Sequence, residues 1–137
     1  MIYERKVNYY ETDAMKIVHH SNYIRYMEES RTNSLEKIGL PYSKMEEDGV
    51  LIPVLGVSCE YKHPARYGEI ILVDVKVKEY TGVRFIMEYE ITDKETGDLI
   101  LVGKTKHCFT DVNLKPISLK KARPYMHEMF LKLQMEG

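Results

Sequence analysis

The chain has 137 residues, 44% of them hydrophobic, and its 20 Lys and Arg side chains nearly balance 21 Asp and Glu side chains, giving a net charge of -1. This length fits a single domain, which we place at residues 1–137, and the balanced charge excludes a general electrostatic binder of nucleic acid or membrane surfaces. The two cysteines, Cys59 and Cys108, lack the CxxC spacing of metal or redox motifs, which predicts free thiols in a reducing cytoplasm. We expect no integral membrane segment, because no apolar run reaches the ~20 residues of a spanning helix.

The first half of the chain predicts one strand and two helices. Residues 2–10 (IYERKVNYY) mix β-branched, aromatic and charged side chains in partial alternation, which predicts a strand with one wet face. Over residues 22–38, apolar or small side chains recur every three or four positions, which predicts a long amphipathic helix with Ser21 as its N-cap and Gly39 just beyond its end. Pro41 and the following YSKMEED predict a short second helix.

The second half of the chain is dominated by predicted strands, followed by a final helix after Pro124. The strand-like runs are IPVLGVSCEY, EIILVDVKVKEY, VRFIMEYEI and DLILVGKTKHCFTDV. One long helix with several consecutive antiparallel strands predicts an α+β fold, in which the helix lies on one face of the sheet because each element needs the other's apolar side. Exposed strand edges would favour pairing with a second copy.

Asp13 is the leading candidate for chemistry, because it lies between a predicted strand and the start of the long helix. Backbone amides around His20 can stabilise an oxyanion, and a carboxylate a few residues upstream could attack a carbonyl or activate a water. The alternative is that Asp13 only stabilises a local turn, as aspartates commonly do. Because adjacent side chains of an extended backbone point in opposite directions, we expect His20, and not His19, to share a pocket with Asp13.

Other chemical readings are weaker. The five histidines do not show the spacing of a zinc site, so we expect no metal. The absence of GxSxG, P-loop and GxGxxG motifs argues against a serine nucleophile and nucleotide hydrolysis. The basic side chains Arg66, Arg84, Lys104 and Lys106 either bind phosphate groups or simply solvate the ends of strands.

The stretch YYETDAMKIVHHSNYIRYMEESR is similar to the signature of the 4-hydroxybenzoyl-CoA thioesterase family. EYKHPARYGEIILVDVKV, VRFIMEYEI and GKTKHCFTDV also resemble segments of that family, so the similarity covers about residues 5 to 124. The resemblance implies the hotdog fold, a curved antiparallel sheet wrapped around one long central helix. It also implies homodimers paired edge to edge, with active sites at the interface, which often associate into homotetramers.

The resemblance assigns roles to individual residues. Asp13 matches the catalytic carboxylate, His20 lies where a helix-terminal N–H polarises the thioester carbonyl, and Tyr9 matches an active-site tyrosine of some relatives. Contacts to coenzyme A are expected from Arg66, Arg84 and Thr81. The sequence departs from the family pattern at Lys16, where many members have glycine, and at His19, where many have an aromatic residue. A lysine loses the easy access to positive φ that glycine has and adds a cation near the expected thioester.

These features predict an enzyme that hydrolyses small or medium acyl-CoA thioesters to a free acid and coenzyme A. Coenzyme A is then part of the substrate, and no cofactor is expected. The alternative is a hotdog module that binds acyl-CoA or an acyl-carrier protein without cleaving it.

Overall fold

The computed structural model describes residues 1–136. Its strands are β1 (Ile2–Lys6), β2 (Val54–Tyr61), β3 (Ile70–Tyr80), β4 (Arg84–Asp93) and β5 (Leu99–Cys108). Its helices are the 3-10 helix η1 (Tyr9–Glu11) and the α-helices α1 (Ser21–Lys37), α2 (Tyr42–Glu47), α3 (Leu119–Ala122) and α4 (Pro124–Glu136). The predicted order of a strand, a long helix, a short helix, consecutive strands and a final helix is therefore confirmed.

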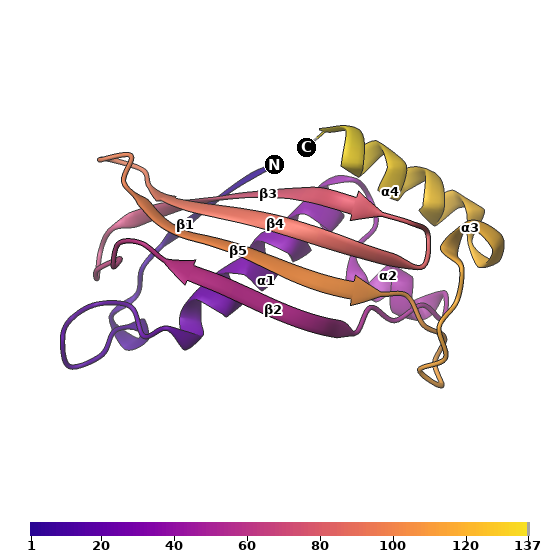
Figure 1. Ribbon diagram of the computed structural model, residues 1–137, viewed down its shortest axis with the longest axis horizontal. Helices are drawn as coiled ribbons and strands as arrows, with labels where there is room; N and C mark the ends of the chain where they lie inside the picture. Colours follow the sequence, from indigo (N-terminus) through magenta and orange to yellow (C-terminus); the bar gives the residue numbers. More distant parts are fainter. Residues whose placement is uncertain (137) are drawn as a thin grey trace.

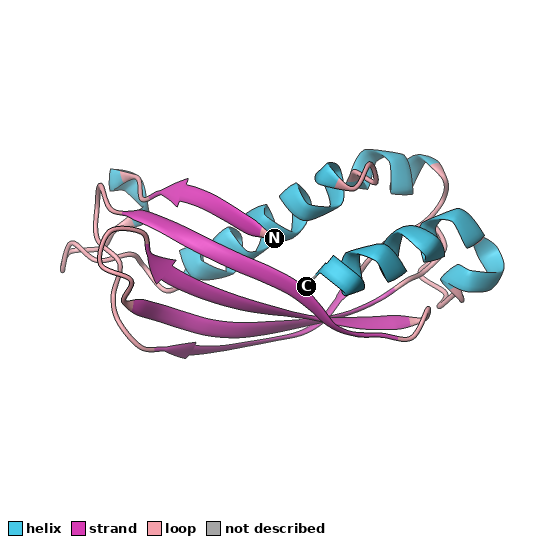
Figure 2. Ribbon diagram, turned by 90° about the horizontal axis from the view of Figure 1, so that it is seen from above, coloured by secondary structure: helices cyan, strands magenta, loops and turns pink. Residues whose placement is uncertain are grey.

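The strands form one antiparallel sheet in the order β1-β3-β4-β5-β2, so that β1 and β2 are its edges. Figure 1 shows α1 running lengthwise behind this sheet, and Figure 2 shows that α1 and α4 lie on the same face. Alternation in β3 explains the two faces, because Val73 and Val75 are buried while Asp74 and Lys76 are exposed. The hotdog arrangement expected from the resemblance is confirmed.

A close approach between α1 and the sheet occurs at Gly103 of β5. A Cβ atom added there would lie 2.7 Å from Sδ of Met27 in α1 and 3.2 Å from the carbonyl oxygen of Ser58 in β2. Glycine therefore allows the helix to sit closer to the sheet than any larger residue could. Met27 is completely buried at this contact.

The C-terminal helix α4 completes the core at one end of the helix-covered face. Rings of Phe85, Phe109 and Phe130 pack together with centroids 5.0 to 5.3 Å apart, and Tyr80 stacks on Phe130 at 5.5 Å. The expectation of a single helix on this face was incomplete, because α4 brings a second apolar stripe to it. Exposed charged side chains such as Lys76 remain on the opposite face.

Several element boundaries differ from the prediction, and the last strand, for example, ends at Cys108 and does not run on to Val112. The first strand ends at Lys6, because the Glu11 carboxylate accepts a 2.8 Å hydrogen bond from the Asn8 amide and the chain turns into η1. Helix α1 has His20, not Ser21, as its N-cap, since the Ser21 hydroxyl contacts Nδ1 of His19 at 2.8 Å instead of capping a helix amide. The predicted helix end is confirmed.

Both cysteines are free, as predicted: Cys59 is half-buried and Cys108 is buried. Burial raises the pKa of the Cys59 thiol. No helix of residues 1–136 is long and apolar enough to cross a membrane. A cytoplasmic location stays a prediction of the sequence.

Candidate active site

A tight hairpin carries Asp13 from the end of η1 to the start of α1. Thr12 pairs with Val18, and the Asp13 amide donates a 2.9 Å hydrogen bond to the carbonyl oxygen of Ile17. The turn closes through the Lys16 amide, which donates to the Asp13 carbonyl oxygen at 2.9 Å. Lys16 adopts φ +65°, a left-handed conformation that suits glycine better than lysine. The backbone at Lys16 thus adopts a turn conformation that lysine disfavours.

The Asp13 carboxylate stabilises this turn with only one of its two oxygens. Oδ1 accepts a 2.8 Å hydrogen bond from the Met15 amide, which is a local turn contact of the kind that aspartates commonly make. Oδ2 has no hydrogen-bond partner within the described residues, and the residue is half-exposed. One carboxylate oxygen therefore orients the side chain, and the other is open to a ligand.

The start of α1 leaves one backbone N–H without an acceptor in the described part of the chain. The Ser21 amide faces Nδ1 of His19 at 3.3 Å, and the Asn22 amide donates to the His19 carbonyl oxygen at 2.9 Å. The Tyr23 amide donates to the His20 carbonyl oxygen at 3.3 Å. The His20 amide has no acceptor within the described part of the chain. Among the first amides of the helix, His20 N–H is the strongest candidate for an oxyanion donor.

Asp13 and His20 line one hollow of about 360 Å³. The aromatic residues Tyr23, Tyr61 and His63 also line it, and its apolar lining comes from Met15, Ile17, Val18 and Pro64. The Ala65 amide donates to the Tyr23 hydroxyl at 3.1 Å, and burial raises the pKa of that hydroxyl, which keeps it neutral. The hollow joins a carboxylate and a free amide to a surface that suits an apolar group.

His19 is absent from the residues that line the hollow, as expected. The physical reason for that expectation was wrong, because the backbone of His20 is helical and not extended. The two imidazole rings do not diverge but stack, with centroids 4.2 Å apart.

Tyr9 and Arg66 lie outside this hollow. Tyr9 is 77% exposed, and its ring packs edge-on against Tyr67 at 5.6 Å. Arg66 pairs through its backbone with Ile17 and is exposed, so that it flanks the hairpin. Its amide donates a 2.6 Å hydrogen bond to the Glu69 carboxylate.

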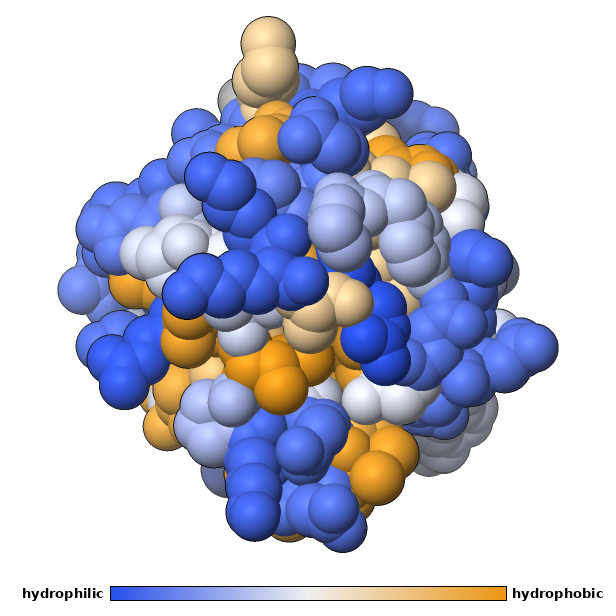
Figure 3. All heavy atoms as spheres, turned by 90° about the vertical axis from the view of Figure 1, so that its right-hand side faces the viewer, coloured by the Kyte–Doolittle hydropathy of each residue, from blue (hydrophilic) through white to orange (hydrophobic). Residues whose placement is uncertain are grey.

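Thr81 and Arg84 lie near the far end of β2, where they line a second hollow of about 330 Å³. Figure 3 faces that end of the molecule, where hydrophilic residues cover most of the surface and hydrophobic ones show between them in small areas. Tyr61 in the first hollow and Leu55 in the second are both on β2. At about 3.3 Å per residue, they lie about 20 Å apart along one strand. One chain alone does not bring these candidate coenzyme A contacts to Asp13.

The sequence did not connect Tyr61 or His63 with Asp13. They follow it by about fifty positions, and His63 was treated only as a histidine without metal spacing. His63 Nε2 lies 3.7 Å from the Asp98 carboxylate. Within residues 1–136, no cluster of three or more His, Cys, Asp or Glu side chains could hold a metal ion.

Comparison with protein families decides the membership of the chain. Residues 7–132 match a family described as the thioesterase-like superfamily. The chain belongs to this superfamily. The narrower 4-hydroxybenzoyl-CoA thioesterase family stays a prediction.

Individual relatives of this thioesterase-like protein agree with that membership. It is 38% identical over 130 residues to "Putative acyl-CoA thioesterase YneP" of Bacillus subtilis, covering 94% of each chain. A solved structure of the DHNA-CoA thioesterase from Staphylococcus aureus superposes with a TM-score of 0.91 at 32% identity, covering 98% of this chain and 90% of the other. A hypothetical protein from Aquifex aeolicus superposes with a TM-score of 0.87 at 38% identity, covering 95% of this chain and 98% of the other.

Proposed function

We propose that this protein hydrolyses acyl-CoA thioesters to a free acid and coenzyme A. The observation that carries this proposal is the hollow lined by Asp13 and by His20, the N-cap of α1, whose amide has no acceptor within residues 1–136. The names of YneP and of the Staphylococcus aureus enzyme support the same reaction class. Coenzyme A enters as part of the substrate.

In the proposed reaction, the thioester carbonyl oxygen accepts a hydrogen bond from the His20 N–H at the positive end of α1. Asp13 either attacks the carbonyl carbon, forming an anhydride that water then cleaves, or takes a proton from the water that attacks. In both routes the C–S bond breaks, one water molecule is consumed, the acyl group leaves as a carboxylic acid, and the thiolate takes up a proton. A positioned base and an oxyanion donor each contribute on the order of 10²-fold or more in rate.

The acyl group is proposed to occupy the apolar side of the hollow. Met15, Val18 and Pro64 supply aliphatic contacts, and Tyr23 and Tyr61 supply aromatic ones. The volume of about 360 Å³ suits a small or medium acyl group.

A homodimer paired through β2 is proposed to complete the site. β2 is an edge strand that exposes Val54, Leu55, Val57 and Tyr61 by 43 to 56%. Unpaired apolar edges favour strand addition, and a second copy is the simplest symmetric partner. If the two β2 strands pair antiparallel, the Tyr61 end of one meets the Val54 end of the other. The Asp13 hollow then lies beside the second hollow of the partner.

This pairing would give the predicted coenzyme A contacts a place in the site. Thr81 and Arg84 of the partner subunit would approach the phosphate groups, while Arg66 flanks the hairpin from the same chain as Asp13. Tyr9 as an active-site tyrosine stays a prediction, since its ring is outside the hollow within one chain. Association of two dimers into a homotetramer also stays a prediction.

The alternative is a module that binds acyl-CoA or an acyl-carrier protein without cleaving it. A carboxylate with one free oxygen favours an enzyme, because a negative charge beside the thioester adds nothing to the binding of an anionic ligand.

A thiol-release assay separates the two functions. Wild-type protein and Asp13→Asn are incubated with short-chain, medium-chain and aromatic acyl-CoA thioesters, and binding of the same ligands is measured by calorimetry. We expect wild-type turnover with at least one of these substrates and a loss of about 10²-fold or more in kcat for the variant, with binding retained. Binding without thiol release by the wild type would support the non-catalytic module.

A further inference from the structure

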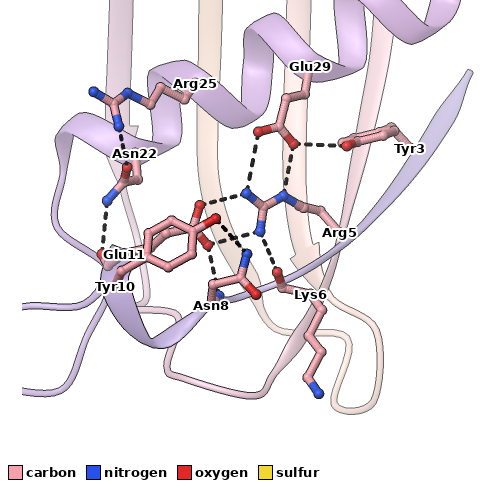
Figure 4. Close-up of polar contacts among 9 residues, drawn as sticks. All are labelled: Tyr3, Arg5, Lys6, Asn8, Tyr10, Glu11, Asn22, Arg25 and Glu29. Atoms are coloured by element: carbon pink, nitrogen blue, oxygen red, sulfur yellow. Dashed lines mark hydrogen bonds and ion pairs between the residues drawn. The ribbon is translucent and has the colours of Figure 1, made fainter.

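A partly buried ion-pair network adjoins the base of the hairpin that carries Asp13. Figure 4 shows the guanidinium of Arg5, on β1, between the carboxylates of Glu11 and Glu29. Nη1 and Nη2 of Arg5 donate to the two carboxylate oxygens of Glu11 at 2.9 and 2.6 Å. Nε donates to Oε1 of Glu29 at 2.9 Å. Arg5 thus grips Glu11 with the parallel two-bond geometry that fixes orientation as well as distance.

Glu11 is also held through its backbone. Its carbonyl oxygen accepts a 2.9 Å hydrogen bond from the His19 amide and another of 2.9 Å from Nδ2 of Asn22. The other end of the Asn22 amide group, Oδ1, faces Nη1 of Arg25 at 3.5 Å, which agrees with the orientation of the side chain. The carboxylate of Glu11 is therefore tied to β1, and its carbonyl oxygen is tied to the start of α1.

These contacts meet at the base of the Asp13 hairpin. The chain leaves Glu11, runs through the turn and returns at His19, whose amide bonds back to Glu11. Asp13 is two residues beyond one anchored position, and His20 is one residue beyond the other. The junction therefore ties together the two ends of the hairpin, one of which leads to Asp13 and the other to His20. A displacement of about 1 Å in a reacting group can lower a rate by about 10²-fold.

We propose that Arg5, Glu11 and Asn22 are positioning residues that hold Asp13 and the His20 amide at the spacing needed for thioester cleavage. This inference rests on the proposed function. A role in stability alone explains the arrangement less well, because a buried ion pair stabilises a fold little more than apolar residues of the same shape. An apolar replacement would not hold the backbone of the hairpin in one place.

The charges of the network are suited to this role. Burial opposes ionisation of Glu11, but the hydrogen bond from Arg5 and the Asn8 amide outweigh it and lower the pKa of the carboxyl. Glu11 therefore remains an ionised acceptor at neutral pH. Glu29 has a second partner, the Tyr3 hydroxyl, which donates to it at 2.8 Å.

Glu29 supplies a matched control for Glu11. Both carboxylates pair with Arg5, but only Glu11 belongs to the segment that carries the hairpin. The variants Glu11→Gln, Asn22→Ala and Glu29→Gln are compared for kcat, KM and thermal unfolding midpoint, and are assayed at a temperature where all are folded. We expect Glu11→Gln and Asn22→Ala to lower kcat by about 10- to 100-fold with KM changed less than about threefold, and Glu29→Gln to remain near wild type.

A fourth variant tests the geometry of the ion pair and not its charge. Arg5→Lys keeps the cation but loses the two-bond grip on Glu11. We expect it to lower kcat as Glu11→Gln does. Equal losses of kcat in Glu11→Gln and Glu29→Gln, or losses that follow the unfolding midpoint, would overturn the positioning role.

Hydrogen exchange of the backbone amides gives a readout that does not depend on activity. The amide of Asp13 is protected by the carbonyl oxygen of Ile17, and we expect it to exchange faster in Glu11→Gln than in Glu29→Gln. Unchanged exchange of the hairpin in Glu11→Gln would contradict the inference. If the wild type released no thiol but the exchange result held, the proposed function would fail while the anchoring of the hairpin stood.

Discussion

The amide N–H of Met15 donates a 2.8 Å hydrogen bond to Oδ1 of Asp13, so the carboxylate proposed to act on the thioester also stabilises its own turn. A structural and a chemical role therefore coincide in one side chain. Substitutions that preserve one role and remove the other can separate them.

Asp13→Asn and Asp13→Ala make this separation. Asparagine keeps an oxygen that can accept from the Met15 amide, whereas alanine does not. We expect both variants to lose turnover, but only Asp13→Ala to lose stability, by about 0.5–1.5 kcal/mol for one hydrogen bond. Urea unfolding and thiol release measure the two effects. Equal destabilisation of both variants would show that the turn depends on the charge and not on the acceptor.

Lys16→Gly is expected to stabilise the protein. A non-glycine residue at φ +65° destabilises the folded state by roughly 1–2 kcal/mol. Glycine removes this strain, but its greater freedom in the unfolded chain offsets about 0.5–1 kcal/mol of the gain in stability. The net gain is about 1 kcal/mol, read as a higher midpoint in thermal or urea unfolding. Lys16→Ala removes the same side chain without relieving the backbone and is the control. A glycine variant no more stable than the alanine variant would contradict the strain.

Mixing two inactive variants tests the proposed subunit pairing. In a dimer of one Asp13→Asn chain and one Arg84→Glu chain, one site carries both changes and the other carries neither, provided that each site uses Arg84 of the partner subunit. Random assembly of equal amounts should recover about a quarter of wild-type activity. Light scattering on the same samples gives the number of chains. If samples shown to contain mixed dimers recover no activity, Arg84 does not act in the active site of the partner subunit.

Because the His107 side chain is buried, we expect the protein to lose stability in mild acid. Its Nε2 contacts the Thr105 hydroxyl at 2.8 Å, while Nδ1 is buried without a partner in residues 1–136. Burial, and after it the charge of Arg31, lowers the pKa of His107 from 6.5 to about 3. Tyr89 links Arg31 to Thr105 through its hydroxyl.

Because the folded-state pKa is depressed, only the unfolded chain takes up this proton between pH 6.5 and about 3. The contribution of neutral His107 to the free energy of unfolding is fully present above pH 6.5. Below pH 6.5 this contribution decreases by up to about 1.4 kcal/mol per pH unit. We expect His107→Gln to show a shallower decline than wild type in urea unfolding between pH 7 and 5. Subtracting the unfolding free energies of the two proteins at each pH cancels the contribution of the carboxylates, which both proteins share. Parallel curves would contradict the assignment.

Local sequence patterns were sufficient for most of the elements. The alternation of Val73 and Val75 with charged neighbours placed β3 and its buried face, and Gly39, at φ +83°, marked the end of α1. The position of Asp13 between a strand and a helix start identified the hairpin region, because the signals for strands, turns and caps act within a few residues. Of the two histidines, only His20 lines the hollow with Asp13, and its part in the chemistry stays a prediction.

The sequence by itself determined the α+β class, the order of the elements and the carboxylate beside the helix start, because hydrophobic periodicity and capping are local properties. Only the tertiary structure decided that Arg5 clasps Glu11, that His63 shares the hollow of Asp13, and that Arg84 lies at the other end of β2. These relations join residues that are distant in the chain or separated by a whole strand. They depend on strand register and on the path of α1 over the sheet, which no local pattern encodes.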